Sequence, residues 1–219
     1  MSFSDLTFLF YFLPLFFAVY YLVPSRCKNA VLVLGSAAFY LLGAGTRDAL
    51  LLGASVLFHY VLARAMDGKA VRARRALLLL GLCTDLFGLV YFKYAAFLLE
   101  NLGKLTGQTF SLVHLALPLG VSFYLFQSAG YLIDVYRGAR AERNLVDFSA
   151  FVLAFPQLTM GPILRYDEWR GALKERMISR EDVFLGFECF AAGLCFKVLL
   201  ADQLAPLWAS LERIGYGYL

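Results

Sequence analysis

A row of polar side chains at helical spacing lies in an otherwise apolar block of the chain. Its members are 3, 4 and 3 residues apart: Tyr124, Gln127, Tyr131 and Asp134. A helix turns once in about 3.6 residues, so these side chains share one face. The opposite side is apolar, with Val121, Phe126 and Leu132. Polar groups are costly inside a membrane. The row therefore predicts either a surface that lines a cavity or a hydrogen-bonded packing seam between helices.

Helix-breaking residues follow this row within residues 145–164, as the dipeptides Phe155-Pro156 and Gly161-Pro162. Non-helical backbone at membrane depth persists only where protein or a water-filled cavity satisfies its polar groups. We therefore predict a broken or re-entrant segment beside an internal cavity. The candidate cavity-lining residues are Tyr124, Gln127, Tyr131, Asp134, Pro156, Gln157, Gly161, Pro162 and Arg165.

Four further titratable residues lie in apolar surroundings. Asp85 is deep within its block and needs a hydrogen-bond partner on another helix, whereas Lys93 can reach the membrane surface with its long side chain. Neither His59 nor His114 has an acid or a second histidine at ligand spacing, so the sequence predicts no metal site. It also contains no glycine-rich phosphate loop and no GxSxG motif.

The elements that must hold these residues are membrane helices. Of the 219 residues 61% are hydrophobic and 16% charged, against about 45–50% and about 25% in ordinary globular domains. The apolar residues gather in blocks of about 18 or more, enough to cross a bilayer. We predict an all-α, polytopic transmembrane helical bundle that forms one membrane domain over residues 1–219. Its expected spans are residues 6–23, 30–42, 49–66, 76–99, 112–135 and 183–209, with the broken or re-entrant segment at 145–164.

Basic residues gather in alternate short loops between the apolar blocks. By the positive-inside rule, the loops with Arg26 and Lys28, with Arg64–Arg75 and with Arg137–Arg143 are cytoplasmic. The first block lacks a basic leader and a small-residue cleavage site, so it is expected to be a retained anchor with its N-terminus outside. The net charge of +4 lies in these loops, which argues against a nucleic-acid partner.

Two motifs resemble those of the membrane-bound O-acyltransferase family, and in particular its bacterial alginate O-acetyltransferase branch. They are LPLGVSFYLFQSAGYLIDVYRG at Leu117–Gly138 and FPQLTMGPILRY at Phe155–Tyr166. The opening FSDLTFLFYFLPLFFAVYYLVP, the FKY at Phe92–Tyr94 and the KVLLADQLA at Lys197–Ala205 are also similar to that branch. The motifs also resemble, more distantly, those of a teichoic-acid D-alanylation protein. The resemblance covers essentially the whole chain.

The resemblance implies a transferase of the bacterial inner membrane that O-acetylates an exopolysaccharide such as alginate. It implies no bound cofactor: the acyl donor, acetyl-CoA or another cytoplasmic acyl carrier, is a substrate. The implied partners are the lipid bilayer and polysaccharide-acetylation proteins on its outer side. The family's catalytic histidine belongs to an arginine- and tryptophan-rich motif that does not occur before Leu219. His59 and His114 match other parts of the family, so we expect this chain to be an N-terminal portion without catalytic residues and inactive alone.

Two other functions stay open at this point. Broken helices with inner polar residues also mark transport sites, although transporters usually contain paired repeats and the sequence has none. A noncatalytic membrane scaffold is the other alternative.

Overall fold

The computed structural model describes residues 3–106, 117–158, 161–174, 176 and 179–213 of the chain. Helices make up nearly all of these residues, and none of them lies in a strand. The predicted all-α fold class is thus confirmed. The chain divides into two compact units, one of residues 16–174 and one of residues 1–15 and 175–219.

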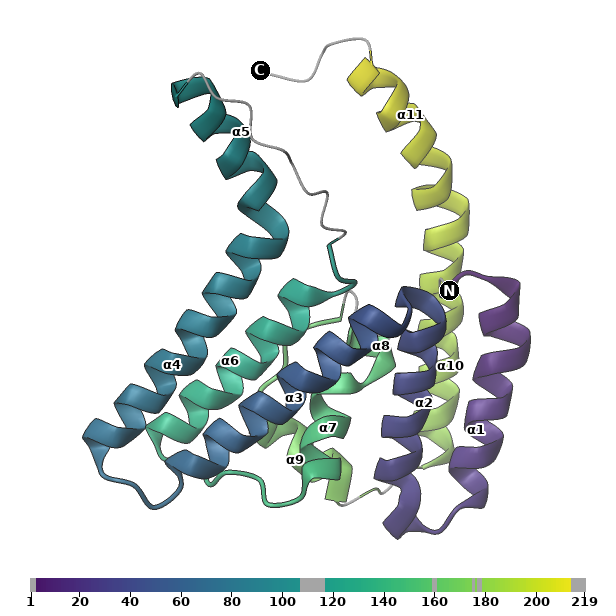
Figure 1. The fold of residues 1–219 in the computed structure, drawn as a ribbon. Helices are drawn as coiled ribbons and strands as arrows, with labels where there is room; N and C mark the ends of the chain where they lie inside the picture. Colours follow the sequence, from purple (N-terminus) through teal and green to yellow (C-terminus); the bar gives the residue numbers. More distant parts are fainter. Residues whose placement is uncertain (1–2, 107–116, 159–160, 175, 177–178, 214–219) are drawn as a thin grey trace. The chain divides into compact units, whose positions relative to one another are not determined.

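The larger unit is built around α6, which packs against α3, α4 and α7, while α2 packs against α3 and α7 (Figure 1). Three of its helices are short: η2 is a 3-10 turn, η3 is a π turn and α8 is a single helical turn. The helices of this unit are the end of α1 (Leu13–Leu22), η2 (Ser25–Cys27), α2 (Lys28–Ala44), α3 (Thr46–Met66), α4 (Val71–Leu89), η3 (Val90–Tyr94), α5 (Ala95–Thr106), α6 (Val121–Arg137), α7 (Leu145–Leu153), α8 (Phe155–Leu158) and α9 (Tyr166–Lys174).

The smaller unit contains η1 (Phe8–Phe12), the start of α1, α10 (Arg180–Cys195), η4 (Phe196–Ala201) and α11 (Asp202–Arg213). A capping box begins α10: the Ser179 hydroxyl accepts a hydrogen bond from the backbone N–H of Asp182, whose carboxylate accepts one from the backbone N–H of Ser179. The π turn η4 brings Lys197 and Asp202 together as an ion pair.

Four helical stretches are long and apolar enough to cross a membrane: Ser25–Ala44, Thr46–Met66, Val71–Tyr94 and Arg180–Leu211. They correspond to the predicted spans at 30–42, 49–66, 76–99 and 183–209. The predicted first span appears as a shorter apolar helix, Phe8–Leu22. These helices support a multi-pass membrane protein.

Three helix boundaries differ from the predicted ones. The helix expected from residue 112 begins at Val121, because Pro118 and the left-handed backbone of Gly120 (φ +69°) precede it. The basic loop was expected to extend to Arg75, but it ends before Val71, where α4 begins. The expected outer loop from Glu100 is helical as far as Thr106. Residues 107–116 lie outside the described part.

The segment 145–164 is broken, as predicted. The helix α7 ends at Leu153, and the backbone of Ala154 (φ −46°, ψ 109°) leaves the helical region before α8 begins. Residues 161–165 are non-helical. A Cβ atom on Gly161 would lie 2.4 Å from the Cα of Gln157, so only glycine fits at this close approach. Whether the segment re-enters the membrane stays a prediction.

Replacing Gly161 by alanine is expected to destabilise the larger unit by about 1–3 kcal/mol, because backbone atoms must move to admit the methyl group. Gly130→Ala is the matched control: nothing lies within 4 Å of its Cβ position in α6, so it should be neutral or slightly stabilising. Thermal unfolding of both variants in detergent measures the difference. Equal midpoints for the two would show that Gly161 is not constrained.

Candidate functional site

The polar row predicted on α6 lies inside the larger unit. Tyr124, Gln127 and Tyr131 are buried, and the side chain of Asp134 is 12% exposed. The Gln127 amide donates a 2.9 Å hydrogen bond to the backbone carbonyl of Phe151 on α7. At Gln127 the row therefore has the geometry of a hydrogen-bonded seam between α6 and α7.

The apolar side of α6, opposite the row, is also largely covered. Val121 and Leu132 are buried, and Phe126 alone of the three predicted apolar residues is exposed, at 52%. The reason is that α6 contacts helices on more than one side, with α3 and α4 in addition to α7. A Cβ on Gly81 of α4 would lie 2.5 Å from a methyl group of Leu132, which shows how closely these two helices approach.

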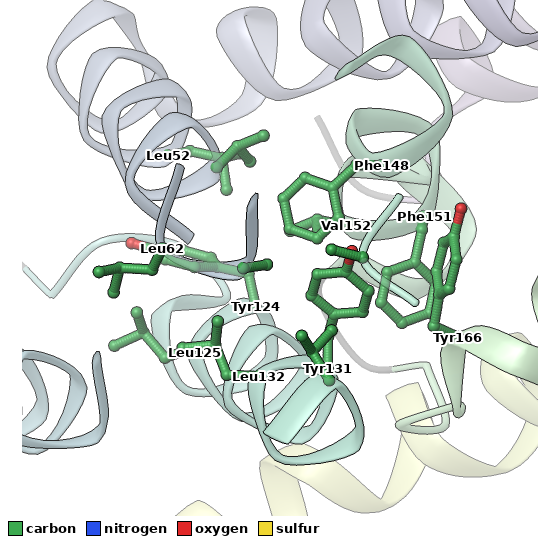
Figure 2. Packing of buried hydrophobic residues seen from close by; sticks show 14 of the residues in the cluster. Leu52, Leu62, Tyr124, Leu125, Tyr131, Leu132, Phe148, Phe151, Val152 and Tyr166 are labelled. Atoms are coloured by element: carbon green, nitrogen blue, oxygen red, sulfur yellow. The ribbon is translucent and has the colours of Figure 1, made fainter. Parts of the chain in front are cut away.

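Aromatic rings fill the contact between α6, α7 and α9 (Figure 2). The Tyr131 ring lies 4.8 Å from the Phe148 ring and 5.1 Å from the Tyr166 ring, between centroids. Phe151 contacts Tyr166 edge to face at 5.1 Å. Such pairs add about 0.5–1.5 kcal/mol each beyond the burial of their area. The seam is therefore held by packing as well as by hydrogen bonds.

The structure joins the row to the broken segment through one ion pair. The Arg165 guanidinium, which follows the break, lies 3.3 Å from the Asp134 carboxylate at the end of the row. The remaining predicted residues are not gathered into one inner surface: Pro156 and Pro162 are exposed, and Gln157 and Gly161 are half-buried.

Two polar atoms near the seam are buried without a hydrogen-bond partner in the described part of the chain. They are the hydroxyl oxygen of Ser128, next to Gln127 on α6, and the side-chain oxygen of Gln157 at the break. Buried polar atoms are nearly always paired, so each such atom is a place where water or a ligand would be stabilised.

Glu142, in the loop between α6 and α7, is a buried carboxylate that sequence reasoning missed. One of its oxygens accepts hydrogen bonds from the backbone N–H groups of Arg143 (2.8 Å) and Asn144 (3.1 Å). The other accepts from the Tyr166 hydroxyl (2.7 Å) and the Lys174 ammonium (3.3 Å). We call these five residues the Glu142 cluster. It ties the loop to α9.

Electrostatics at the Glu142 cluster favour the ionised carboxyl. Burial by itself would raise the pKa of Glu142, but the hydrogen bonds from Tyr166, from the two backbone N–H groups and from Lys174 outweigh it and lower the pKa to about 2. Burial and the bond to Glu142 raise the pKa of Tyr166 well above its ordinary value. Tyr166 therefore stays a neutral donor and Glu142 a charged acceptor.

His59 of α3 and Asp85 of α4 form a buried pair. The imidazole Nε2 lies 2.9 Å and 3.1 Å from the two carboxylate oxygens, and both side chains are nearly inaccessible. The partner expected for Asp85 on another helix is thus found. The absence of an acid at ligand spacing from His59 did not reveal this partner, because Asp85 is adjacent only in space and lies 26 residues away along the chain.

The contacts of His59 fix the proton content of the pair. Nδ1 lies 2.7 Å from the backbone carbonyl of Ser55, which can only accept, so Nδ1 carries a proton. Between Nε2 and Asp85 there must be a second proton, on either partner. The pair then has no net charge, which suits its burial.

Ser55, His59 and Asp85 do not form a nucleophilic triad. The Ser55 hydroxyl is 3.4 Å from Nδ1, but that nitrogen already donates to the carbonyl and cannot take the hydroxyl proton. Within the described residues, no group of three His, Cys, Asp or Glu side chains could hold a metal ion. His114 lies outside those residues. The buried pair therefore joins α3 to α4.

The known proteins to which this chain is similar are all described as enzymes of O-acetylation. The chain is 42% identical over 216 residues to a probable alginate O-acetylase of Azotobacter vinelandii, an alignment that covers 94% of this chain and 43% of that protein. It is 42% identical to the protein of the same description from Pseudomonas aeruginosa, covering 41% of it. It is 30% identical over 239 residues to a peptidoglycan O-acetyltransferase of Helicobacter pylori, covering 45% of it.

No family model matches the chain, and no solved structure does so either. The similarity to the curated relatives nevertheless extends over nearly all of this chain, as the motif resemblance predicted. Over 94% of its own length the chain is therefore similar to alginate O-acetylases, and it spans less than half of the length of these relatives.

Proposed function

We propose that this chain is part of a membrane O-acetyltransferase that modifies a polysaccharide outside the cytoplasm. The observation that carries the proposal is the 42% identity to alginate O-acetylases over 94% of the chain. The four apolar helices support the same proposal, because they would place this part of the enzyme in the bilayer. In this proposal the chain provides helices that shape the active site of the enzyme, and the catalytic histidine belongs to a later segment.

Alginate is the acceptor that we propose, since the relatives with the higher identity are described as alginate O-acetylases and the peptidoglycan enzyme is less similar. The proposed acyl donor is acetyl-CoA or another cytoplasmic acyl carrier, which is consumed as a substrate. The proposed location is the bacterial inner membrane with the N-terminus outside, in company with acetylation proteins on the outer side.

The α6 row and the broken segment are the part of this portion that we propose lies against the acyl-transfer path. The buried, unpartnered side-chain oxygen of Gln157 supports this, because it offers a hydrogen-bond acceptor at the break. The pair of Asp134 and Arg165 would fix the non-helical residues 161–165 relative to α6. In this proposal the seam orients the wall of the path and takes no part in bond breaking.

A chimera tests the proposed activity. The chain replaces the matched segment of the Pseudomonas aeruginosa alginate O-acetylase, and the chimera is expressed in a strain that lacks that protein. Base-labile acetyl groups on the secreted alginate should reappear. A chimera that inserts into the membrane at normal abundance but leaves the polymer unacetylated would contradict the proposal.

Within the chimera, Gln127→Leu is expected to lower acetylation by about tenfold, because the carbonyl of Phe151 loses its buried donor and α7 shifts beside the broken segment. Asp134→Leu should act similarly by releasing Arg165. Phe126→Leu is the matched control on the same helix, since its side chain is exposed. Acetyl content is normalised to the amount of inserted protein. Equal acetylation by all variants would show that the polar row on α6 serves only to pack the helices.

A further inference from the structure

One end of the larger unit carries exposed basic side chains with few acids to neutralise them. The loop between α3 and α4 and the loop between α6 and α7 lie at the same end of these helices (Figure 1). We define the basic rim as the six exposed residues Lys69, Arg72, Arg75, Arg137, Arg140 and Arg143.

Three further basic residues of the larger unit are paired with acids. Arg64 pairs with Asp67 at 3.4 Å, Arg165 pairs with Asp134, and Lys174 binds Glu142. Among the residues that the structure describes, no carboxylate lies within ion-pair distance of any member of the basic rim. The rim is therefore a concentration of six positive charges without an ion-pair partner among the described residues.

Hydrogen bonds fix the two loops that carry the rim. The Arg74 guanidinium donates to the backbone carbonyls of Val135 (2.6 Å) and Tyr136, so the first turn of α4 is fastened to the last turn of α6. The Tyr60 hydroxyl donates to the carbonyl of Arg143 at 2.6 Å, and the Tyr131 hydroxyl accepts from the backbone N–H of Glu142 at 2.7 Å. These bonds hold the backbone segments that carry the rim in a defined arrangement.

The surface beside the rim is apolar and exposed. Val61 near the end of α3 is 54% exposed, Val71 in the first turn of α4 is 68% exposed, and Leu79 two turns further along is 50% exposed. We call these three residues the apolar band; exposed apolar side chains close in sequence to exposed basic ones match the change from acyl chains to headgroups at a bilayer surface. A site for a soluble anion would not need the apolar band.

We propose that the basic rim binds the phosphate groups of anionic phospholipids, with the exposed apolar band in contact with their acyl chains. Arginine suits this role because its guanidinium donates two hydrogen bonds to a phosphate. The consequence is that this end of the protein faces an anionic leaflet and enriches acidic lipids around it.

Native mass spectrometry of the full chain tests the proposal. The detergent-solubilised chain is incubated with an equimolar mixture of phosphatidylglycerol and phosphatidylcholine, and the ratio of the two bound lipids is measured. The wild-type chain should prefer phosphatidylglycerol, and Arg72→Gln/Arg140→Gln should reduce the preference by about fivefold for each charge removed. Raising the ionic strength should reduce it as well, because salt screens exposed charges.

Two further variants separate a binding site from a general effect of charge. Lys93→Gln/Lys104→Gln removes two exposed positive charges from η3 and α5 and should keep the preference. Arg72→Lys/Arg140→Lys keeps the charge and should retain most of the preference. Equal losses in the rim variant and the Lys93/Lys104 variant would overturn the proposal, as would an unchanged preference in the rim variant. Displacement of phosphatidylglycerol by inorganic diphosphate at equal concentration would overturn it too, because the rim would then be a site for a soluble phosphate.

Discussion

Replacing Glu142 by leucine is expected to lower the free energy of unfolding of the larger unit by about 3 kcal/mol. The change leaves the buried Tyr166 hydroxyl and the partly buried backbone N–H groups of Arg143 and Asn144 without their acceptor. Each unsatisfied buried donor costs about 1–3 kcal/mol. Glu142→Gln is the matched control, because its amide oxygen can still accept from the two backbone groups and should lose only about 1 kcal/mol. Thermal unfolding in detergent gives both values.

The same carboxylate predicts how this difference depends on pH. The fold lowers the pKa of Glu142 from 4.5 to about 2, so its stabilisation is complete above pH 4.5 and is lost as the pH falls toward 2. The wild-type chain should therefore lose stability in that window, while the glutamine side chain of the control does not titrate. We expect the gap in unfolding midpoint between wild type and Glu142→Gln to shrink between pH 7 and pH 3. A constant gap would mean that Glu142 is not an ionised acceptor in the fold.

The helices of this protein are predictable because the membrane imposes a simple rule on the sequence. An apolar block of sufficient length must satisfy its backbone internally, and a helix does so. The spans at 49–66 and 183–209 consequently fall within observed helices. The helix ends are less predictable, since they depend on single residues such as Pro118 and Gly120, whose effect an average over many residues conceals.

The polar row illustrates the other limit of sequence reasoning. Helical periodicity places Tyr124, Gln127 and Tyr131 on one face, and all three are indeed buried together. Periodicity says nothing about how many neighbours a helix has. With α3, α4 and α7 all packed against α6, Leu132 is as buried as the polar residues. The burial of Leu132 is thus a result of the tertiary arrangement, in which α4 approaches α6 closely at Gly81.

The Glu142 cluster was not foreseeable from local pattern. Its members come from a loop without periodicity and from α9, and Tyr166 is 24 residues from Glu142 in the sequence. A weak signal existed: an acid among the basic residues of the segment at Arg137–Arg143 stands out by its charge. An isolated acid in a basic loop is a reasonable candidate for a buried acceptor, although the donors cannot be named without the fold.

His59 and Asp85 give the second large expected effect. Asp85→Leu is expected to destabilise the larger unit by about 3–5 kcal/mol, because it removes one partner of a buried pair and leaves the Nε2 of His59 without its partner. His59→Leu should cost a similar amount for the same reason, with the Asp85 carboxyl left alone. The measurement is again thermal unfolding in detergent, supported by the fraction of protein that elutes as a single species.

The double variant His59→Leu/Asp85→Leu distinguishes a structural pair from any other role. If the pair only joins α3 to α4, two apolar side chains of suitable volume should restore much of the stability, since no polar group is then left unpaired. The coupling energy between the two positions should thus be large and should offset most of the single losses. Additive losses would contradict a direct interaction between the two side chains. A stable double variant that nevertheless failed to support acetylation in the chimera would assign the shared proton of this pair a part in the reaction.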